Sequence, residues 1–283
     1  MIENADMKPQ IRHSVLLLPG LCGTYRELGA IPRVLEDSGY HVCIPDIPGY
    51  ANSNRDINWV AWIEQLEASY TELRESSESV VVIGLSMGAT LALKLAQRRD
   101  DMDGVVLLSP VLRYDGWAMP FYHPLIRLAY WLGFKNWKWR EKPPYGIANI
   151  ELRRRVQKSV ERGEASEVGA AFISARHMHA AQQLMHDTRL WLSHVSVPVL
   201  VMHAVEDETA APRNTEEILR KINSEVRRAI WLGDSYHIIT VDNEREVVVN
   251  ETVRFVDQCV QGTTLSAGFR DRARTLRLKD RRG

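Results

Sequence analysis

The stretch that decides the fold is VVVIGLSMGAT, residues 80–90, in which a strongly apolar run ends at a small polar residue between two glycines. The valines and the isoleucine predict a buried strand, because β-branched side chains suit a pleated surface. Residues 87–99 place apolar side chains at helical spacing, which predicts a helix. Ser86 is therefore expected at a strand-to-helix turn, in a Gly-x-Ser-x-Gly pattern with Gly84 and Gly88.

This glycine spacing suits a nucleophile held out on a very tight turn. Such a residue takes a positive φ, and the strand and helix come so close to it that a Cβ two residues away would collide. The turn also leaves Ser86 at the first turn of the helix, where free N–H groups and the positive end of the dipole favour an oxyanion. The alternative is a glycine-rich connection with an incidental serine.

Similar apolar stretches recur along the chain with helical segments between them. Short, nearly continuous apolar strands that alternate with helices predict a parallel sheet covered on both faces. Right-handed crossovers then make the fold doubly wound, so we expect an α/β fold with a mostly parallel sheet of about six strands. The expected strands are residues 14–20, 40–46, 79–84, 103–110, 197–203 and 227–233, and the expected helices are residues 26–38, 57–75, 87–99, 214–222 and 243–260.

Residues 112–193 break this rhythm, with no convincing strand and with five of the eight tryptophans. Large apolar residues in 120–134, followed by a helix rich in Arg and Glu near 150–162, predict a helical insertion over the C-terminal edge of the sheet. Ligands bind at such edges in open α/β sheets, although the insertion could instead be extra core packing. The expected division is an α/β core of residues 1–111 and 194–261, a helical cap of residues 112–193, and a basic, disordered tail of residues 262–283.

Composition and charge argue against several classes of protein. The 283 residues carry zero formal net charge, which favours neither nucleic acid nor an acidic partner. The N-terminus lacks the basic and apolar regions of a signal peptide, and no apolar run approaches the roughly 20 residues that span a bilayer. Cys22, Cys43 and Cys259 have neither metal-type spacing nor an even number. We therefore expect a cytoplasmic protein, with at most peripheral membrane contact through the basic tail or the cap.

A serine hydroxyl needs a base to take its proton and an acid to orient that base. In the stretch HAVEDETAAP, Glu206 and Asp207 follow one predicted strand, and in GDSYHIITVDNE, His237 follows the next. Both loops leave the same edge of the sheet as Ser86. Of the nine histidines, His237 is the strongest candidate base, whereas His203 ends its strand and is expected to pack there.

These motifs together resemble those of serine hydrolases of the α/β-hydrolase superfamily, and are most similar to small bacterial carboxylesterases and monoacylglycerol lipases. The matching stretches are LLLPGLCG, DIPGYANS, GLSMGA, EDETA and DSYHIITVDNE, and the resemblance covers residues 14–110 and 197–260. The chain departs from the family pattern at Pro19, at Tyr50 with Ala51, and at Ser235 with Tyr236. None of these changes removes a reacting group.

The resemblance implies a catalytic triad of Ser86, Asp207 and His237, with Asp207 preferred to Glu206 by its spacing. It also implies an oxyanion hole made of the backbone N–H groups of Leu21 and Met87, and a reaction that needs no metal or organic cofactor. The expected activity is hydrolysis of small-molecule apolar acyl esters, as in a carboxylesterase or monoacylglycerol lipase. An acyl thioesterase, an acyltransferase or a peptidase would use the same triad, and a ligand-binding homologue without turnover is the alternative from another class.

Overall fold

The computed structural model describes residues 13–50, 58–118, 143–162 and 172–261, together with Tyr130, Gly133 and residues 138–140. The predicted tail of residues 262–283 and most of the apolar segment 120–134 lie outside the described residues. Within these ranges, no helix combines the length and the apolar character that a bilayer crossing requires.

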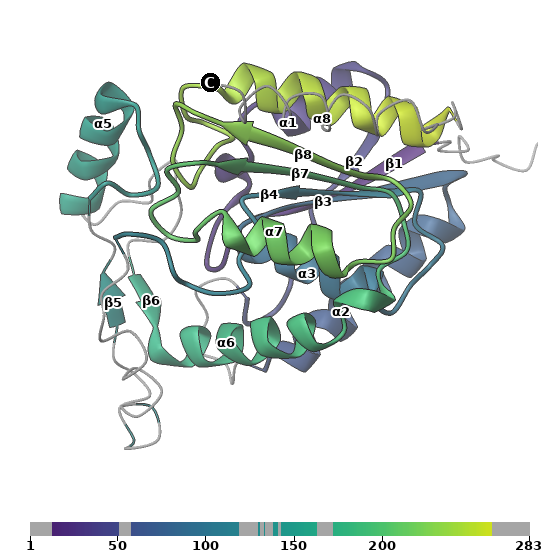
Figure 1. The fold of residues 1–283 in the computed structure, drawn as a ribbon, viewed down its shortest axis with the longest axis horizontal. Coiled ribbons are helices and arrows are strands. Elements are labelled where there is room, and N and C mark those ends of the chain that lie inside the picture. The colour runs from purple at the N-terminus through teal and green to yellow at the C-terminus, as the bar shows by residue number, and fades with distance from the viewer. Residues whose placement is uncertain are drawn as a thin grey trace, which may run out of the picture.

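A six-stranded sheet forms the centre of the molecule (Figure 1). Its strands run in the order β2-β1-β3-β4-β7-β8, and every neighbouring pair is parallel. The inner strands are buried along their whole length, as continuous apolar runs in a sheet covered on both faces require. The predicted α/β fold is confirmed. The strands are β1 His13–Leu18, β2 His41–Cys43, β3 Ser79–Leu85, β4 Gly104–Leu108, β7 Val199–Ala204 and β8 Arg227–Leu232.

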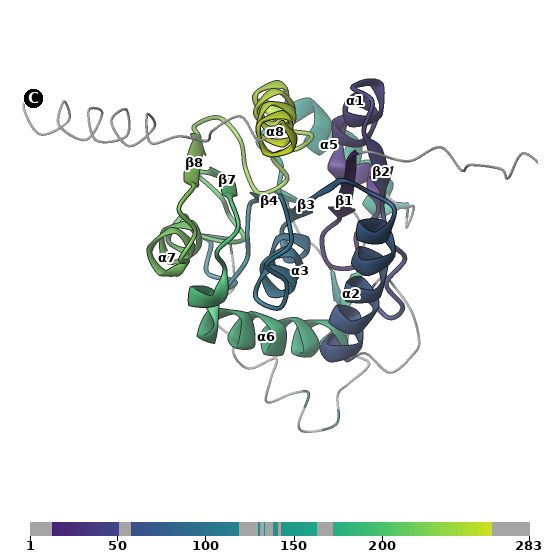
Figure 2. The same cartoon turned by 90° about the vertical axis from the view of Figure 1, so that its right-hand side faces the viewer.

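Helices cover the two faces of this sheet (Figure 2). Helices α1 and α8 lie on one face, and α2, α3 and α7 lie on the other. Each face has its own apolar cluster, so the sheet separates two cores. The helices are α1 Ile31–Asp37, α2 Trp59–Glu75, α3 Met87–Ala96, α7 Arg213–Lys221 and α8 Arg245–Val260.

The prediction of one helix over residues 26–38 is wrong. The chain forms a short 3₁₀ helix, η1 (Tyr25–Leu28), and then begins α1 at Ile31. Gly29 separates the two with φ 59°, and a Cβ there would collide with the carbonyl of Thr240. A close approach from a distant segment therefore breaks the helix that the local pattern favours.

The prediction that residues 112–193 contain no strand is also wrong. Two short strands, β5 (Lys138–Arg140) and β6 (Phe172–Ser174), pair antiparallel. Together with α5 (Ile150–Glu161), close to the Arg- and Glu-rich helix predicted there, they lie at the end of the sheet where the strands have their C-termini (Figure 1). Helix α6 (Ala175–Leu190) instead runs beneath α2 and α3, and it is followed by the 3₁₀ turn η2 (Leu192–His194).

Candidate active site

Ser86 occupies the turn between β3 and α3 and has φ 58° and ψ −117°. Its backbone N–H donates to the carbonyl of Leu108 at 2.8 Å, which fastens the turn to the neighbouring strand β4. A Cβ on Gly84 would collide with the carbonyl of Gly88, and a Cβ on Gly88 would collide with the carbonyl of Leu18. Both glycines are therefore required by the close approach of backbone to backbone around the serine.

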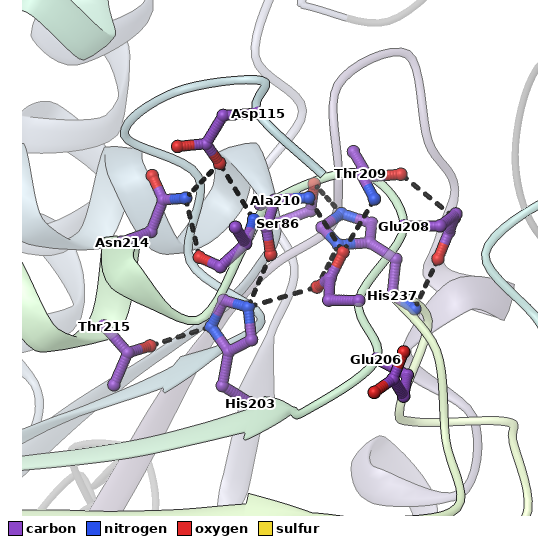
Figure 3. A network of polar contacts seen from close by, with 12 residues as sticks. Ser86, Asp115, His203, Glu206, Glu208, Thr209, Ala210, Asn214, Thr215 and His237 are labelled. Atoms are coloured by element: carbon purple, nitrogen blue, oxygen red, sulfur yellow. Dashed lines mark hydrogen bonds and ion pairs between the residues drawn. The ribbon is translucent and has the colours of Figure 1, made fainter. Parts of the chain in front are cut away.

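His237 and Asp207 come from the loops that follow β8 and β7 and meet Ser86 at this edge of the sheet. Figure 3 shows Ser86 and His237 together. Nε2 of His237 lies 2.8 Å from Oγ of Ser86, and Nδ1 lies 2.8 Å from Oδ2 of Asp207. An ionised carboxylate only accepts hydrogen bonds, so Nδ1 carries the hydrogen and Nε2 turns its lone pair toward the serine hydroxyl. The three residues thus stand in the order that proton transfer from a serine requires.

The carboxylate of Asp207 is buried and receives hydrogen bonds at both oxygens. Oδ1 accepts the backbone N–H groups of Thr209 and Ala210 at 2.9 and 2.8 Å, and Oδ2 faces His237 and, at 3.3 Å, Nε2 of His203. Burial by itself would raise the pKa of Asp207. The positive charge of His237 and hydrogen bonds from both histidines outweigh that effect and hold this pKa well below its usual range. Asp207 is therefore ionised at neutral pH.

The glutamates on either side of Asp207 have different surroundings. Glu206 is exposed and stands apart from the network in Figure 3. Glu208 is buried, and its Oε2 accepts the backbone N–H of His237 at 3.2 Å. Burial raises the pKa of Glu208, and the charge of Asp207 adds to the rise, against a lowering by His237. Sequence reasoning missed Glu208, because no motif distinguishes a glutamate that supports the loop of His237.

Two further carboxylates hold the loop that carries His237, residues 233–244. Asp242 is fully buried and accepts four backbone N–H groups, and Glu244 accepts three hydrogen bonds at the start of the loop. The donors to Asp242 are Ala148, Asn149, Tyr236 and Asn243, and the donors to Glu244 are the backbones of Gly233 and Asp234 and the hydroxyl of Ser235. The only signal for them in the sequence is their closeness to His237.

The predicted oxyanion donors, Leu21 and Met87, lie on the two segments that border Ser86. Met87 is the first residue of α3, so no carbonyl of its own helix accepts its N–H. Leu21 follows Gly20, where a Cβ would stand 3.6 Å from Cβ of Ser86. The buried Glu27 holds this loop, because its Oε2 accepts the N–H of Gly20 at 3.1 Å.

A cavity of about 360 Å³ lies beside the same loop, between residues 19–25 and 44–50. Tyr50, which stands where the family pattern has histidine, is buried next to it and donates its hydroxyl to the carbonyl of Pro19 at 3.0 Å. Burial raises the pKa of Tyr50 far above its usual value, so the hydroxyl stays a donor. Cavities of this size accommodate small ligand groups.

The described residues contain no group of three or more His, Cys, Asp or Glu side chains that could hold a metal ion.

The sheet, the strained serine turn and the histidine and aspartate loops define an α/β-hydrolase. The chain belongs to the hydrolase family described as serine aminopeptidase, S33, whose model matches residues 9–245. The predicted resemblance is thereby confirmed at the level of the family.

Two curated relatives are similar along most of the chain. One is the thermostable monoacylglycerol lipase of Bacillus sp. (strain H-257), 22% identical over 244 residues, or 85% of this chain and 89% of that protein. The other is a carboxylesterase of Bacillus subtilis (strain 168), 22% identical over 249 residues, or 87% of this chain and 92% of that protein.

Solved structures of lipases share the fold. The monoacylglycerol lipase of Paleococcus ferrophilus has a TM-score of 0.73 at 18% identity, with 87% of this chain and 94% of that chain covered. A soluble variant of monoglyceride lipase from Saccharomyces cerevisiae has a TM-score of 0.72 at 16% identity, with 90% of this chain and 89% of that chain covered.

Proposed function

We propose that the protein is a serine carboxylic-ester hydrolase that acts on apolar acyl esters through an acyl-enzyme on Ser86. The observation that carries this proposal is the continuous contact from Ser86 to His237 to Asp207, with 2.8 Å at each step. The names of the two curated relatives, a monoacylglycerol lipase and a carboxylesterase, favour an ester over the peptide bond that the family description suggests.

In the first half of the reaction, Oγ of Ser86 attacks the acyl carbonyl carbon while Nε2 of His237 accepts its proton. The resulting oxyanion is held by the backbone N–H groups of Leu21 and Met87. When the tetrahedral intermediate collapses, the bond to the alcohol breaks and His237 gives its proton to the departing oxygen. Asp207 keeps the hydrogen on Nδ1 and stabilises the imidazolium that forms between these steps.

In the second half, a water molecule takes the place of the alcohol. The water oxygen attacks the acyl carbon while His237 accepts a proton from the water. His237 then donates that proton to Oγ of Ser86 as the bond between Oγ and the acyl carbon breaks. The acid leaves, and the serine is regenerated. Each proton moves through Nε2 of one histidine, so the sequence balances with water as the only co-reactant.

The preference for apolar acyl groups rests on residues 112–174, the part of the 112–193 segment that precedes α6, which we propose to be a cap over the site. Helix α6 itself packs against α2 and α3. In support, α5 and the β5–β6 pair lie at the C-terminal edge of the sheet, and Trp117 is 60% exposed beside the loop of Asp207, with its Nε1 donating to the carbonyl of Glu206 at 3.2 Å. Each methylene removed from water contributes about 0.8 kcal/mol, or roughly fourfold in rate when the transition state captures it.

Fluorophosphonate labelling tests the nucleophile, with a matched control on the next strand. Ser86→Ala should abolish both the label and ester turnover. Ser109 directly follows β4 and has φ 44°, and its buried hydroxyl has no hydrogen-bond partner in the described part of the chain. Ser109→Ala should therefore keep both signals. Ester hydrolysis that survives in clean Ser86→Ala protein would sink the proposed mechanism.

A substrate panel tests the acyl group and the leaving group separately. We expect kcat/KM for p-nitrophenyl esters to rise from acetate toward medium chains, and charged acyl groups to react poorly because the apolar cap offers little in place of their hydration. A flat profile below micelle formation would mean that residues 112–174 only pack against the core. Matched thioesters and anilides in the same panel separate the thioesterase and peptidase alternatives from the esterase.

A further inference from the structure

A second histidine, His203, contacts the same Asp207 carboxylate as His237. Figure 3 shows both histidines. His203 belongs to β7 and is completely buried. Its Nε2 lies 2.8 Å from the carbonyl oxygen of Ala210 and 3.3 Å from Oδ2 of Asp207. Its Nδ1 lies 2.7 Å from Oγ1 of Thr215, on α7. The sequence predicted only that this residue packs in its strand.

These contacts determine which ring nitrogen of His203 carries hydrogen. A carbonyl oxygen only accepts hydrogen bonds, so the contact with Ala210 places a hydrogen on Nε2. The hydroxyl of Thr215 can donate to Nδ1 at the opposite side of the ring. The hydrogen on Nε2 is thus donated to the carbonyl of Ala210, and the same nitrogen lies 3.3 Å from Oδ2 of Asp207. As a result, ring nitrogens of two histidines lie close to the same oxygen, Oδ2.

The two histidines differ in what the reaction asks of them. His237 accepts and releases a proton in each half-reaction, so its pull on Oδ2 changes through the cycle. The χ2 torsion of an aspartate has a broad energy minimum. A partner such as His237, whose charge changes during the reaction, would therefore hold the carboxylate orientation poorly. His203 has no contact with Ser86 and takes part in no proton transfer. Its Nε2 therefore stays beside the carboxylate, held there by the carbonyl of Ala210, while His237 changes charge.

We propose that His203 is a positioning residue, which fixes the rotation of the Asp207 carboxylate so that Oδ2 faces His237 throughout turnover. The inference rests on the proposed function. The backbone N–H groups of Thr209 and Ala210 hold Oδ1, His203 holds Oδ2, and the carboxylate is fixed at both ends. A residue that served stability alone would tie β7 to α7 through Thr215 without affecting the bond between His237 and Asp207.

Three variants and a control separate these two roles. His203→Leu removes both ring contacts, and His203→Gln keeps an N–H donor near the position of Nε2. Thr215→Val removes the partner of Nδ1. His13→Gln is the control, because His13 begins β1 at the opposite edge of the sheet and contacts a serine hydroxyl, Oγ of Ser79, at 3.0 Å. The measurements are kcat and KM for p-nitrophenyl butyrate, the melting temperature, and the deshielded proton between His237 and Asp207 in the proton NMR spectrum.

We expect His203→Leu to lower kcat by about 10–100-fold, the range typical for residues that orient a reacting group, with KM nearly unchanged. The deshielded proton should broaden or disappear. His203→Gln should recover most of kcat and the proton signal, Thr215→Val should fall between them, and His13→Gln should leave both as in the wild type. A variant set in which only the melting temperature changes would overturn the proposal, as would equal losses of kcat in the Leu and Gln variants.

If His203→Leu does not fold, the other two variants test the positioning role through kcat and the deshielded proton. We then expect both to fall in Thr215→Val and to stay near the wild-type values in His203→Gln. Failure of the proposed function is recognised separately. A wild-type protein that neither hydrolyses esters nor reacts with fluorophosphonate would contradict the esterase assignment, while the dependence of the deshielded proton on His203 could still be measured.

Discussion

The serine turn and the two loops that face it are held in place by different kinds of force. Around Ser86 the constraint is steric, because β1, β3 and α3 approach so closely that only glycine fits at positions 84 and 88. Around His237 and Asp207 the constraint is polar. Buried carboxylates, among them Glu208 and Asp242, accept backbone N–H groups of the loops.

This difference shows how the site divides its tasks. In the proposed mechanism, Ser86 must stay at one point relative to the oxyanion donors, and close backbone packing provides that rigidity. In the same mechanism, His237 takes up a positive charge in every cycle, and the buried, ionised Asp207 beside it favours that charge. Steric constraint therefore fixes the attacking atom, and electrostatic constraint fixes the atoms that exchange protons.

The largest effect should come from removing the charge of Asp207, the central group of the polar network around His237. Asp207→Asn removes the charge and stabilises the wrong tautomer of His237, so turnover should fall by about 10³–10⁴-fold. Glu206→Gln is the matched control and should cost much less, because Glu206 is exposed and outside the network. Steady-state kinetics on both variants make the comparison. A larger loss of turnover in Glu206→Gln than in Asp207→Asn would mean that Glu206, and not Asp207, is the acid of the triad.

Disturbing the close backbone packing around Ser86 should have the next largest effect. Gly88→Ala places a methyl group against the carbonyls of Leu18 and Pro19, and we expect it to cost about 3 kcal/mol or more of unfolding free energy, with a loss of activity. Gly233→Ala is the control, since a Cβ there meets nothing within 4 Å. Denaturant unfolding of both variants measures the difference. Equal stability of the two would show that the turn is not closely packed.

A smaller effect should follow from weakening Asp242, which supports the loop of His237 through a backbone N–H group. Asp242→Asn leaves one accepting oxygen for four backbone N–H groups, so we expect a loss of about 1–3 kcal/mol and a moderate fall in kcat. Asp234→Asn, in the same loop but exposed, should behave like the wild type. Thermal unfolding and kcat together check this prediction, and unchanged kcat in Asp242→Asn would show that the loop does not depend on this carboxylate.

The smallest effect concerns acid sensitivity. Burial alone would raise the pKa of Glu217, but hydrogen bonds from Lys221 and Arg113 lower it to about 2. A carboxyl with a lowered pKa stabilises the fold fully above its unfolded pKa of about 4.3, and loses that contribution as the pH falls toward the folded value. Since both cations are a third or more exposed, the contribution is on the order of 1 kcal/mol.

Urea unfolding at several pH values tests this expectation. Wild type should be more stable than Glu217→Gln near pH 6, and the gap should narrow between about pH 4 and pH 2. The exposed neighbour provides the control, because Glu216→Gln should show no such convergence. A gap that widened on acidification would contradict the assignment of Glu217 as a charged partner of Arg113 and Lys221.

The two kinds of constraint also explain what the sequence could predict. The serine turn is a local steric requirement, so its glycines stand at fixed spacing and the pattern around Ser86 can be read directly. Strands and helices of the sheet follow from their apolar periodicity in the same way. The loop after the last predicted strand pointed to His237, and family spacing favoured Asp207 over Glu206; the structure brings both together with Ser86.

The polar supports could not be predicted, because several of their partners are backbone groups far away in the chain. Asp242 accepts N–H groups 93 and 94 residues before it, and Glu208 accepts one 29 residues after it. His203 looked like a packing residue, since nothing in its strand indicates that a loop folds back onto its ring. The break at Gly29 was missed for the same reason, because the contact that requires it comes from Thr240.

The hydrogen bond from the hydroxyl of Thr240 to the carbonyl of Glu27 joins segments 213 residues apart. It connects the loop beside Leu21 with the loop of His237, which follows β8, a strand at the edge of the sheet. During synthesis, the serine turn and its oxyanion loop leave the ribosome long before the histidine does. Under the proposed mechanism, a nascent or prematurely ended chain presents Ser86 without its base, and ester hydrolysis arises only once nearly the whole polypeptide has been made.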